Sequence, residues 1–183
     1  MTDFLQAHPD GQVIALDEMS LYFQATTTRV WSVVGETPLI RVSPQRDHTH
    51  VYGALNLDTG HEFALPAPEM TSVTTADFLR EIIACYPTQP ILLLWDRAKW
   101  HKGDAVRQVL GENPRLEPMF FPPACPELNP QEHVWSQARA AISHNHTFAL
   151  FARLKTAFLT YLSTTLFRFD WLTKYVPPIL CQV

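Results

Sequence analysis

The chain has 183 residues, of which 46% are hydrophobic and 17% are charged. This composition is typical of one compact globular domain and excludes a disordered chain. No segment approaches the roughly 20 apolar residues that cross a bilayer, and the first residues lack the basic start and apolar stretch of a secretory signal. We therefore expect a cytoplasmic protein that has no membrane partner.

The three cysteines are Cys85, Cys125 and Cys181, which lie far apart and form no C-x-x-C pair. This pattern argues against a disulfide scaffold and against a cysteine zinc site. We expect reduced and mostly buried thiols.

The net charge of −4 argues against a nucleic-acid partner, because phosphate binding relies on clustered Lys and Arg. The charge is unevenly distributed, however. Residues 1–132 sum to −8 and residues 133–183 sum to +4. The acidic residues are therefore concentrated toward the N-terminal part.

The first third of the chain reads as strands. Residues 12–24 combine β-branched and aromatic residues in short apolar runs, which predicts a buried strand that ends near Asp17. Turn residues separate further predicted strands, and their succession indicates an antiparallel meander. These further strands cover residues 28–34, 39–42, 50–57 and 61–65.

Helices and strands alternate in the next part of the chain. Apolar residues recur at helical spacing over 76–85, with Thr74 and Asp77 as a capping box. Residues 91–95, Ile-Leu-Leu-Leu-Trp, are apolar at every position, which predicts a strand buried on both faces in the middle of a sheet. A helix over 103–110 and a strand over 116–121 are predicted to follow.

A proline-rich loop then leads into a helix with clear start signals. Asn129 stands at the N-cap, Pro130 at the first helical position and Glu132 at the third, and we expect the helix to run to about Ser143. Thr147 is predicted to cap a last helix with an apolar face suited to packing on a sheet. The residues of that face are Phe151, Leu154, Phe158, Leu162 and Leu166. The order of elements indicates an α/β fold with a leading antiparallel meander.

Three acidic residues stand at constrained positions of this predicted fold. Asp17 and Asp96 fall at strand ends, and Glu132 lies in the first turn of a helix that leaves the proline loop. A carboxylate directly after an apolar strand is costly to keep ionised unless a cation or hydrogen bonds offset its desolvation. Hard oxygen donors favour Mg²⁺ or Mn²⁺ over zinc, and a pair of such ions can drive phosphoryl transfer.

Each acid also has a purely structural interpretation. Glu132 can be the capping-box partner of Asn129, and Asp17 and Asp96 can accept turn hydrogen bonds. Glu18 follows Asp17, so strand alternation turns it to the opposite face, where we expect it to be solvated or paired with an Arg. A structural explanation is plausible for any one of these acids, but it is much less probable for all three together.

The acids stand among other motifs: Asp17-Glu18, Asp96 with Ala98 and His101, and Pro126-Glu127-Leu128-Asn129-Pro130 with Glu132 and Trp135. Arg29-x-Trp31 and Gly35-x-x-Pro38 accompany them. Together these motifs, over residues 12–165, resemble the catalytic domain of mariner-type DDE transposases, especially those of bacterial insertion sequences. The last block is the most specific part, and the 35 residues between Asp96 and Glu132 are close to the spacing of that family.

The resemblance implies a ribonuclease H-like fold with a central mixed sheet, a leading antiparallel meander and flanking helices over residues 12–166. Residues 1–11 are then a linker remnant and residues 167–183 a C-terminal tail. Asp17, Asp96 and Glu132 are implied as catalytic and metal-binding residues for two Mg²⁺ ions, with Mn²⁺ as a substitute. The implied activity is cleavage of DNA at a transposon end, followed by attack of the freed 3′-hydroxyl on target DNA.

The resemblance also implies partners. We expect DNA, a second copy of the chain in a homodimer, and a helix-turn-helix module that is separate or missing, because the 11 residues before the first strand cannot hold one. In a bacterial host the protein is then associated with the nucleoid. Candidate DNA contacts are Arg97, Lys99, His101, Lys102 and Arg139.

Arg97 stands where the family commonly has Asn after the second acid. This departure keeps two alternatives open: a catalytically silent relic that binds DNA or a partner subunit, and a ribonuclease H-like nuclease without strand joining. His101 can instead orient a carboxylate. We expect the pairs His48/His50 and His144/His146 to lie in solvated turns rather than at zinc. The tryptophans are expected mainly in the core, at Trp31, Trp95, Trp100, Trp135 and Trp171.

Overall fold

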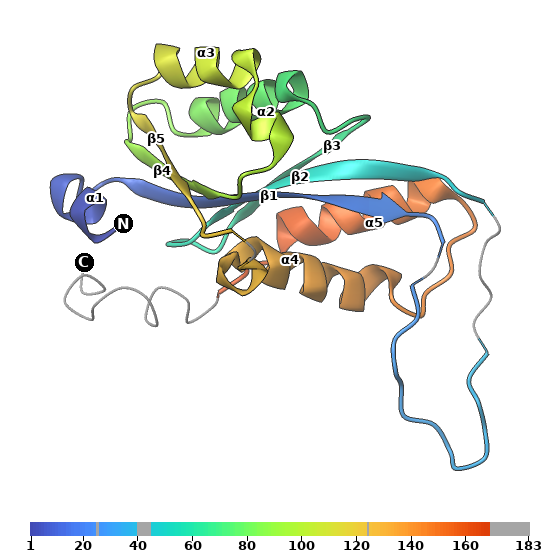
Figure 1. The fold of residues 1–183 in the computed structure, drawn as a ribbon. Helices are drawn as coiled ribbons and strands as arrows, with labels where there is room; N and C mark the ends of the chain where they lie inside the picture. Colours follow the sequence, from blue (N-terminus) through green and yellow to red (C-terminus); the bar gives the residue numbers. More distant parts are fainter. Residues whose placement is uncertain (25, 40–44, 124, 169–183) are drawn as a thin grey trace.

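A five-stranded mixed sheet forms the centre of the computed structural model, which describes residues 1–24, 26–39, 45–123 and 125–168. The strand order is β3-β2-β1-β4-β5 (Figure 1). β1 pairs antiparallel with β2, and β2 pairs antiparallel with β3, whereas β4 and β5 continue the sheet in parallel. The strands are β1 (Gln12–Tyr22), β2 (His48–Asn56), β3 (Glu62–Ala67), β4 (Ile91–Trp95) and β5 (Leu116–Phe120).

Helices cover both faces of the sheet (Figure 1). α2 (Ser72–Cys85) and α3 (Asp104–Glu112) pack on one face, where Ile14 and Leu16 of β1 point. α4 (Pro130–Ala138) and α5 (Phe151–Thr164) pack on the other, against Val13 and Ala15. This alternation along β1 decides which face each following side chain reaches. The mixed sheet between helical layers confirms the predicted fold class.

The strongest local signals gave the correct elements. All five residues of β4 are buried, as a continuous apolar run predicts. α4 begins as expected, with Asn129 as N-cap accepting a hydrogen bond from the Gln131 backbone N–H and with Pro130 in its first turn. It ends sooner than predicted, and a π-helical turn, Arg139–Ser143, continues it. The predicted strands at 50–57, 61–65 and 116–121 are confirmed within a few residues as β2, β3 and β5.

Several predictions about the N-terminal half were wrong. β1 continues to Tyr22, so Asp17 lies within the strand and not at its end. Residues 28–34 form no strand: the nearest isolated β-bridge in the described chain is that of Thr26 with His144, outside the segment, and Thr28 bonds to the side chain of Asn145. Trp31, predicted in the core, is fully exposed. It belongs to the long connection between β1 and β2, which extends away from the sheet (Figure 1). The predicted strand at 39–42 falls largely outside the described residues.

The ends of helices and the cysteines also differ from expectation. α2 begins at Ser72 with a capping box between Thr71 and Thr74, because the threonine hydroxyls reach each other's backbone N–H groups. α5 starts after Leu150, without a side-chain cap, so Thr147 is not its N-cap. Cys85 is exposed instead of buried, and Cys125 is half-buried. Cys181 and Trp171 lie outside the described residues.

Segments at both ends of the predicted catalytic domain pack on it. Residues expected to be a linker form a short helix, α1 (Thr2–Ala7), with Phe4 buried in the core. Phe167, at the start of the expected tail, is also buried, and its backbone N–H donates to the carbonyl of Gly60. Among the described residues, no helix combines the length and apolar character needed to cross a membrane.

Candidate metal centre

Asp17 lies in the middle of β1 and faces α4, since it follows Val13 and Ala15 at strand spacing. Its Oδ2 accepts a hydrogen bond of 3.2 Å from Nε1 of Trp135. Burial, and to a smaller extent the negative charges of Glu18 and Glu132, raise the pKa of Asp17 to about 7. The side chain is therefore a buried acid in need of a countercharge when it is ionised.

Asp96 follows β4 directly and is 54% exposed, so this acid does stand at a strand end, as predicted. Its Oδ1 accepts a hydrogen bond of 2.9 Å from the Ala98 backbone N–H and forms an ion pair of 2.9 Å with Nδ1 of His101, which also lies within hydrogen-bond distance, 3.2 Å, of the Asp96 backbone carbonyl. The hydrogen bond from His101 lowers the pKa of Asp96, although burial acts in the opposite direction. Asp96 is thus held as an oriented carboxylate.

Glu132 lies in the first turn of α4, with an exposed side chain. The N-cap hydrogen bond comes from Gln131, and within the described residues no hydrogen bond joins the Glu132 carboxylate to Asn129 or to another group. The capping-box interpretation of Glu132 is therefore wrong. The proline loop and the Asn129-Pro130 start fix the first turn of the helix, and the Glu132 carboxylate of this turn is available to bind a ligand.

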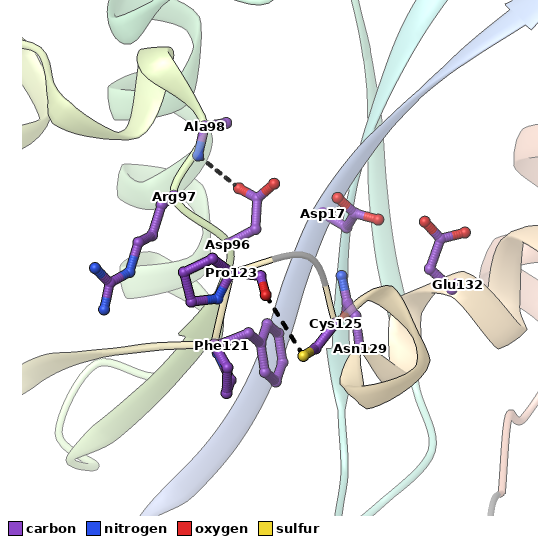
Figure 2. A pocket seen from close by; sticks show the side chains of 10 residues that line it. Asp17, Asp96, Arg97, Ala98, Phe121, Pro123, Cys125, Asn129 and Glu132 are labelled. Atoms are coloured by element: carbon purple, nitrogen blue, oxygen red, sulfur yellow. Dashed lines mark hydrogen bonds between the residues drawn. The ribbon is translucent and has the colours of Figure 1, made fainter.

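The three carboxylates meet at one cavity of about 430 Å³. Figure 2 shows Asp17, Asp96 and Glu132 pointing into it from β1, from the end of β4 and from α4. In the part of the chain that the structure describes, no three His, Cys, Asp or Glu side chains lie close enough together to hold one metal ion as they stand. The three acids therefore line a common cavity without forming a ready-made ligand cluster.

The donor set fits a hard divalent cation. It consists of carboxylates alone, and neither Asp17 nor Glu132 has a cationic partner within the described ranges. Carboxylates held together without compensating charge favour Mg²⁺ or Mn²⁺.

Glu18 and His101 form a buried cluster behind Asp96, and the sequence predicted only part of this arrangement. Glu18 does point to the face opposite Asp17, but its side chain is 2% exposed and neither solvated nor paired with an Arg. Its two oxygens accept hydrogen bonds of 3.0 Å from Nε2 of His101 and from Nε1 of Trp100. His101 stacks on Trp95 with ring centroids 4.5 Å apart.

His101 joins Glu18 to Asp96 as a buried cation. Burial by itself would lower the pKa of His101, but its hydrogen bonds to Asp96 and Glu18 outweigh this effect and raise the pKa to about 9. Both ring nitrogens therefore donate at neutral pH. His101 is buried, a position from which it can orient Asp96 but from which its side chain does not reach the surface, where the predicted DNA contact would need it.

The other predicted DNA contacts surround the cavity unevenly. Arg97 is exposed, lines the cavity, and places its guanidinium 5.8 Å from the centre of the Phe120 ring. Lys99 and Lys102 are exposed on the adjoining short helix, Lys99–Lys102. Arg139 lies half-buried beyond the C-terminal end of α4 and is not among the residues that line the cavity.

One histidine of each pair makes a side-chain hydrogen bond. His48 and His50 lie on β2, not in a turn, and His50 contacts Ser20 Oγ through Nδ1 at 3.0 Å. His144 contacts Thr26 Oγ1 at 2.7 Å. Neither pair belongs to a potential metal cluster in the described part of the chain.

The raised pKa of Asp17 predicts a pH-dependent penalty in the metal-free protein. Between the ordinary Asp pKa and about 7, the folded chain keeps a proton that the unfolded chain releases, so the free energy of unfolding falls as pH rises through this range. Asp17→Asn removes the penalty. In the presence of a chelator we expect the variant to be more stable than wild type by about 2–4 kcal/mol near pH 8, and equally stable near pH 4.

Urea unfolding of both proteins at the two pH values measures this difference. Asp10→Asn, a change at an exposed aspartate, is the control and should alter stability by less than about 0.5 kcal/mol. Equal stability of wild type and Asp17→Asn near pH 8 would show that Asp17 is not a strained buried acid.

Comparison with known proteins agrees with the fold. A family model described as DDE superfamily endonuclease matches residues 12–155. The insertion element IS630 uncharacterized 39 kDa protein of Shigella sonnei is 24% identical over 131 residues, which are 71% of this chain and 38% of that protein.

Two solved structures of Mos1 transposase share the fold: its paired-end complex with the left transposon end and its mariner paired end complex with Mn. Each gives a TM-score of 0.65 and covers 87% of this chain and 50% of the other, at 18% and 17% identity respectively. The chain thus spans half or less of the length of these relatives. These matches show that the chain shares its fold with the matched part of Mos1 transposase.

Proposed function

Since this chain belongs to the DDE superfamily endonuclease family, we propose that it is the catalytic domain of a transposase and that Asp17, Asp96 and Glu132 are its catalytic carboxylates. The observation that carries the proposal is the meeting of these three side chains, from β1, β4 and α4, at one cavity (Figure 2). The match to Mos1 transposase on a transposon end supports DNA as the substrate.

We propose Mg²⁺ as the natural cofactor, with Mn²⁺ as a substitute and two ions in the site. Asp17, Asp96 and Glu132 would hold the ions. When bound, the ions supply Lewis acidity to the attacking and leaving oxygens of phosphoryl transfer. The Mos1 complex solved with Mn supports this choice of metal.

The residues of the chain then have separate tasks. Asp17 gains the countercharge that its buried position lacks, while His101 and Glu18 keep Asp96 oriented toward the cavity. Glu132 closes the site from a helix turn that the proline loop fixes. No side chain needs to form a covalent bond to DNA. In the first step water attacks a phosphodiester phosphorus and displaces its 3′-oxygen, and in the second the freed 3′-hydroxyl attacks a target phosphodiester and displaces that 3′-oxygen.

Recognition of the transposon end is assigned to a different part of the machinery. The chain is acidic overall, with a net charge of −4, so we expect it to bind DNA weakly by itself. We propose that a helix-turn-helix module supplies specific binding and that the active assembly is a homodimer.

Two assays test this function. The first measures nicking of a labelled DNA duplex in Mn²⁺, and the second measures joining of an oligonucleotide with a free 3′-hydroxyl to target DNA. A transposase domain nicks and joins, whereas a simple nuclease nicks without joining. A silent relic does neither. The observation that favours a relic is that Arg97 replaces the Asn common in the family.

We further propose that Arg97, with Lys99 and Lys102, contacts the DNA backbone at the cavity rim. Arg97→Ala is expected to weaken DNA binding uniformly across sequences and to reduce the slope of log K against log salt by about 1. Fluorescence anisotropy with a labelled duplex in chelator, over a series of salt concentrations, measures both quantities.

Arg80→Ala is the matched control, because Arg80 is an exposed arginine of α2, paired with Asp77, that does not line the cavity. This variant should keep the wild-type slope. The same slope for Arg97→Ala and wild type would remove Arg97 from the DNA interface.

A further inference from the structure

A second buried acid lies next to the proposed site without lining its cavity. Glu62 is the first residue of β3, and its side chain is buried on the face that α4 covers. Its Oε1 accepts a hydrogen bond of 2.5 Å from Nε2 of Gln131, which is itself fully buried. Gln131 directly precedes Glu132 in the first turn of α4.

This contact leaves two oxygens unexplained. Oε2 of Glu62 and Oε1 of Gln131 are buried, and neither has a hydrogen-bond partner in the described part of the chain. A buried unsatisfied acceptor destabilises the fold, and an ionised one does so more strongly. An ionised Glu62 has no donor to offer Gln131, whereas a protonated carboxyl has one. One proton on Oε2 of Glu62 can therefore satisfy both oxygens.

We propose that Glu62 is a neutral carboxylic acid that forms a two-hydrogen-bond pair with Gln131 and thereby positions Glu132. In this pair Gln131 Nε2 donates to Glu62 Oε1, and the Glu62 hydroxyl donates to Gln131 Oε1. Glu62 is a positioning residue and does not touch metal or DNA. The part of the proposal that concerns Glu132 rests on the proposed function.

The surroundings of Glu62 favour the neutral form. Burial raises the pKa of Glu62 well above its ordinary value, the hydrogen bond from Gln131 offsets part of this effect, and the charge of Asp17 adds to it. No Lys, Arg or His makes an ion pair with Glu62 within the described residues. A buried acid without a cation is stable when it carries its proton.

Gly53 provides the room for the pair. It lies on β2 opposite Asp17 of β1, and a Cβ there would overlap Gln131 Nε2, Glu62 Oε1 and the ring of Trp135. α4 is thus tied to the sheet at two points: Gln131 to Glu62 on β3, and Trp135 to Asp17 on β1. Glu132 lies between these two attachments, so their loss would release its helix turn.

Three variants test the pair. Glu62→Gln keeps two hydrogen bonds, because two amides can pair as an acid and an amide do, whereas Glu62→Leu leaves the Gln131 amide buried without a partner. The double variant Glu62→Gln/Gln131→Glu exchanges the two groups and keeps one acid and one amide. The readouts are amide hydrogen exchange in α4 of the metal-free protein and the Kd for Mn²⁺.

In Glu62→Leu we expect first-turn amides of α4 to exchange about tenfold faster, while amides of α2 on the opposite face keep their wild-type rates. The Kd for Mn²⁺ should rise about tenfold, which is the usual effect of losing a group that orients a ligand. Glu62→Gln and the exchanged double variant should stay within about twofold of wild type in both readouts.

Two results would overturn the proposal. Wild-type exchange in Glu62→Leu would show that the pair does not hold the helix turn, and an effect of Glu62→Gln as large as that of Glu62→Leu would show that an ionised Glu62 is required. Absence of Mn²⁺ binding by wild type would instead contradict the proposed function, and hydrogen exchange would still decide whether the pair exists.

Discussion

Asp96→Asn and Glu132→Gln are each expected to reduce Mn²⁺-dependent nicking of DNA about a thousandfold. Each change keeps the size of the side chain and removes the negative charge of one proposed metal ligand. Metal stabilisation of the attacking and leaving oxygens is worth several kcal/mol, and each 1.4 kcal/mol corresponds to about a factor of ten in rate. Initial rates on a labelled duplex, with protein in excess over DNA, measure the effect.

Glu127→Gln is the control for these variants. Glu127 is an exposed acid of the same proline loop but does not line the cavity. We expect its nicking rate to stay within about twofold of wild type. Because the ligands act as a unit, the double variant Asp96→Asn/Glu132→Gln should lose little more than either single variant. Wild-type nicking by Glu132→Gln would remove Glu132 from the site.

The second large effect is on stability. His101→Ala is expected to lower the free energy of unfolding by about 3–5 kcal/mol near pH 7, because it leaves the Glu18 carboxylate buried without a cation. The double variant His101→Ala/Glu18→Gln also removes the unpaired buried charge, so it should regain about half of the lost free energy of unfolding.

This stabilisation has a defined pH dependence. The pKa of His101 rises to about 9 on folding, from an ordinary value of 6.5. The stability contributed by protonated His101 is fully present below the ordinary value and is lost as pH rises through about 9. The difference between wild type and His101→Ala in urea unfolding should therefore shrink between about pH 6 and pH 10. Equal stability of the two proteins near pH 7 would contradict the ion pair.

The sequence was most informative where one local signal decides the structure. A wholly apolar run followed by an acid predicted both β4 and the strand-end position of Asp96. Asn followed by Pro predicted the start of α4 and the place of Glu132 in its first turn. These signals depend on residues that are neighbours in the chain, so no knowledge of tertiary contacts was needed.

The remaining features depend on partners distant in the sequence. Glu18 and His101 are 83 positions apart, and Glu62 and Gln131 are 69 positions apart. An isolated Glu in a strand reads as solvated until the residue that covers it is known. The β-branched segment 28–34 shows the converse, because strand propensity produces no strand where no neighbouring strand pairs with it.

Titration of the metal-free protein with Mn²⁺, followed by calorimetry, tests most directly whether the three carboxylates form a metal site. We expect wild type to bind Mn²⁺, and Asp17→Asn, Asp96→Asn and Glu132→Gln each to weaken binding about tenfold or more, with Glu127→Gln unchanged. No binding by wild type, or equal binding by wild type and all three carboxylate variants, would contradict the assignment of the cavity as the metal centre.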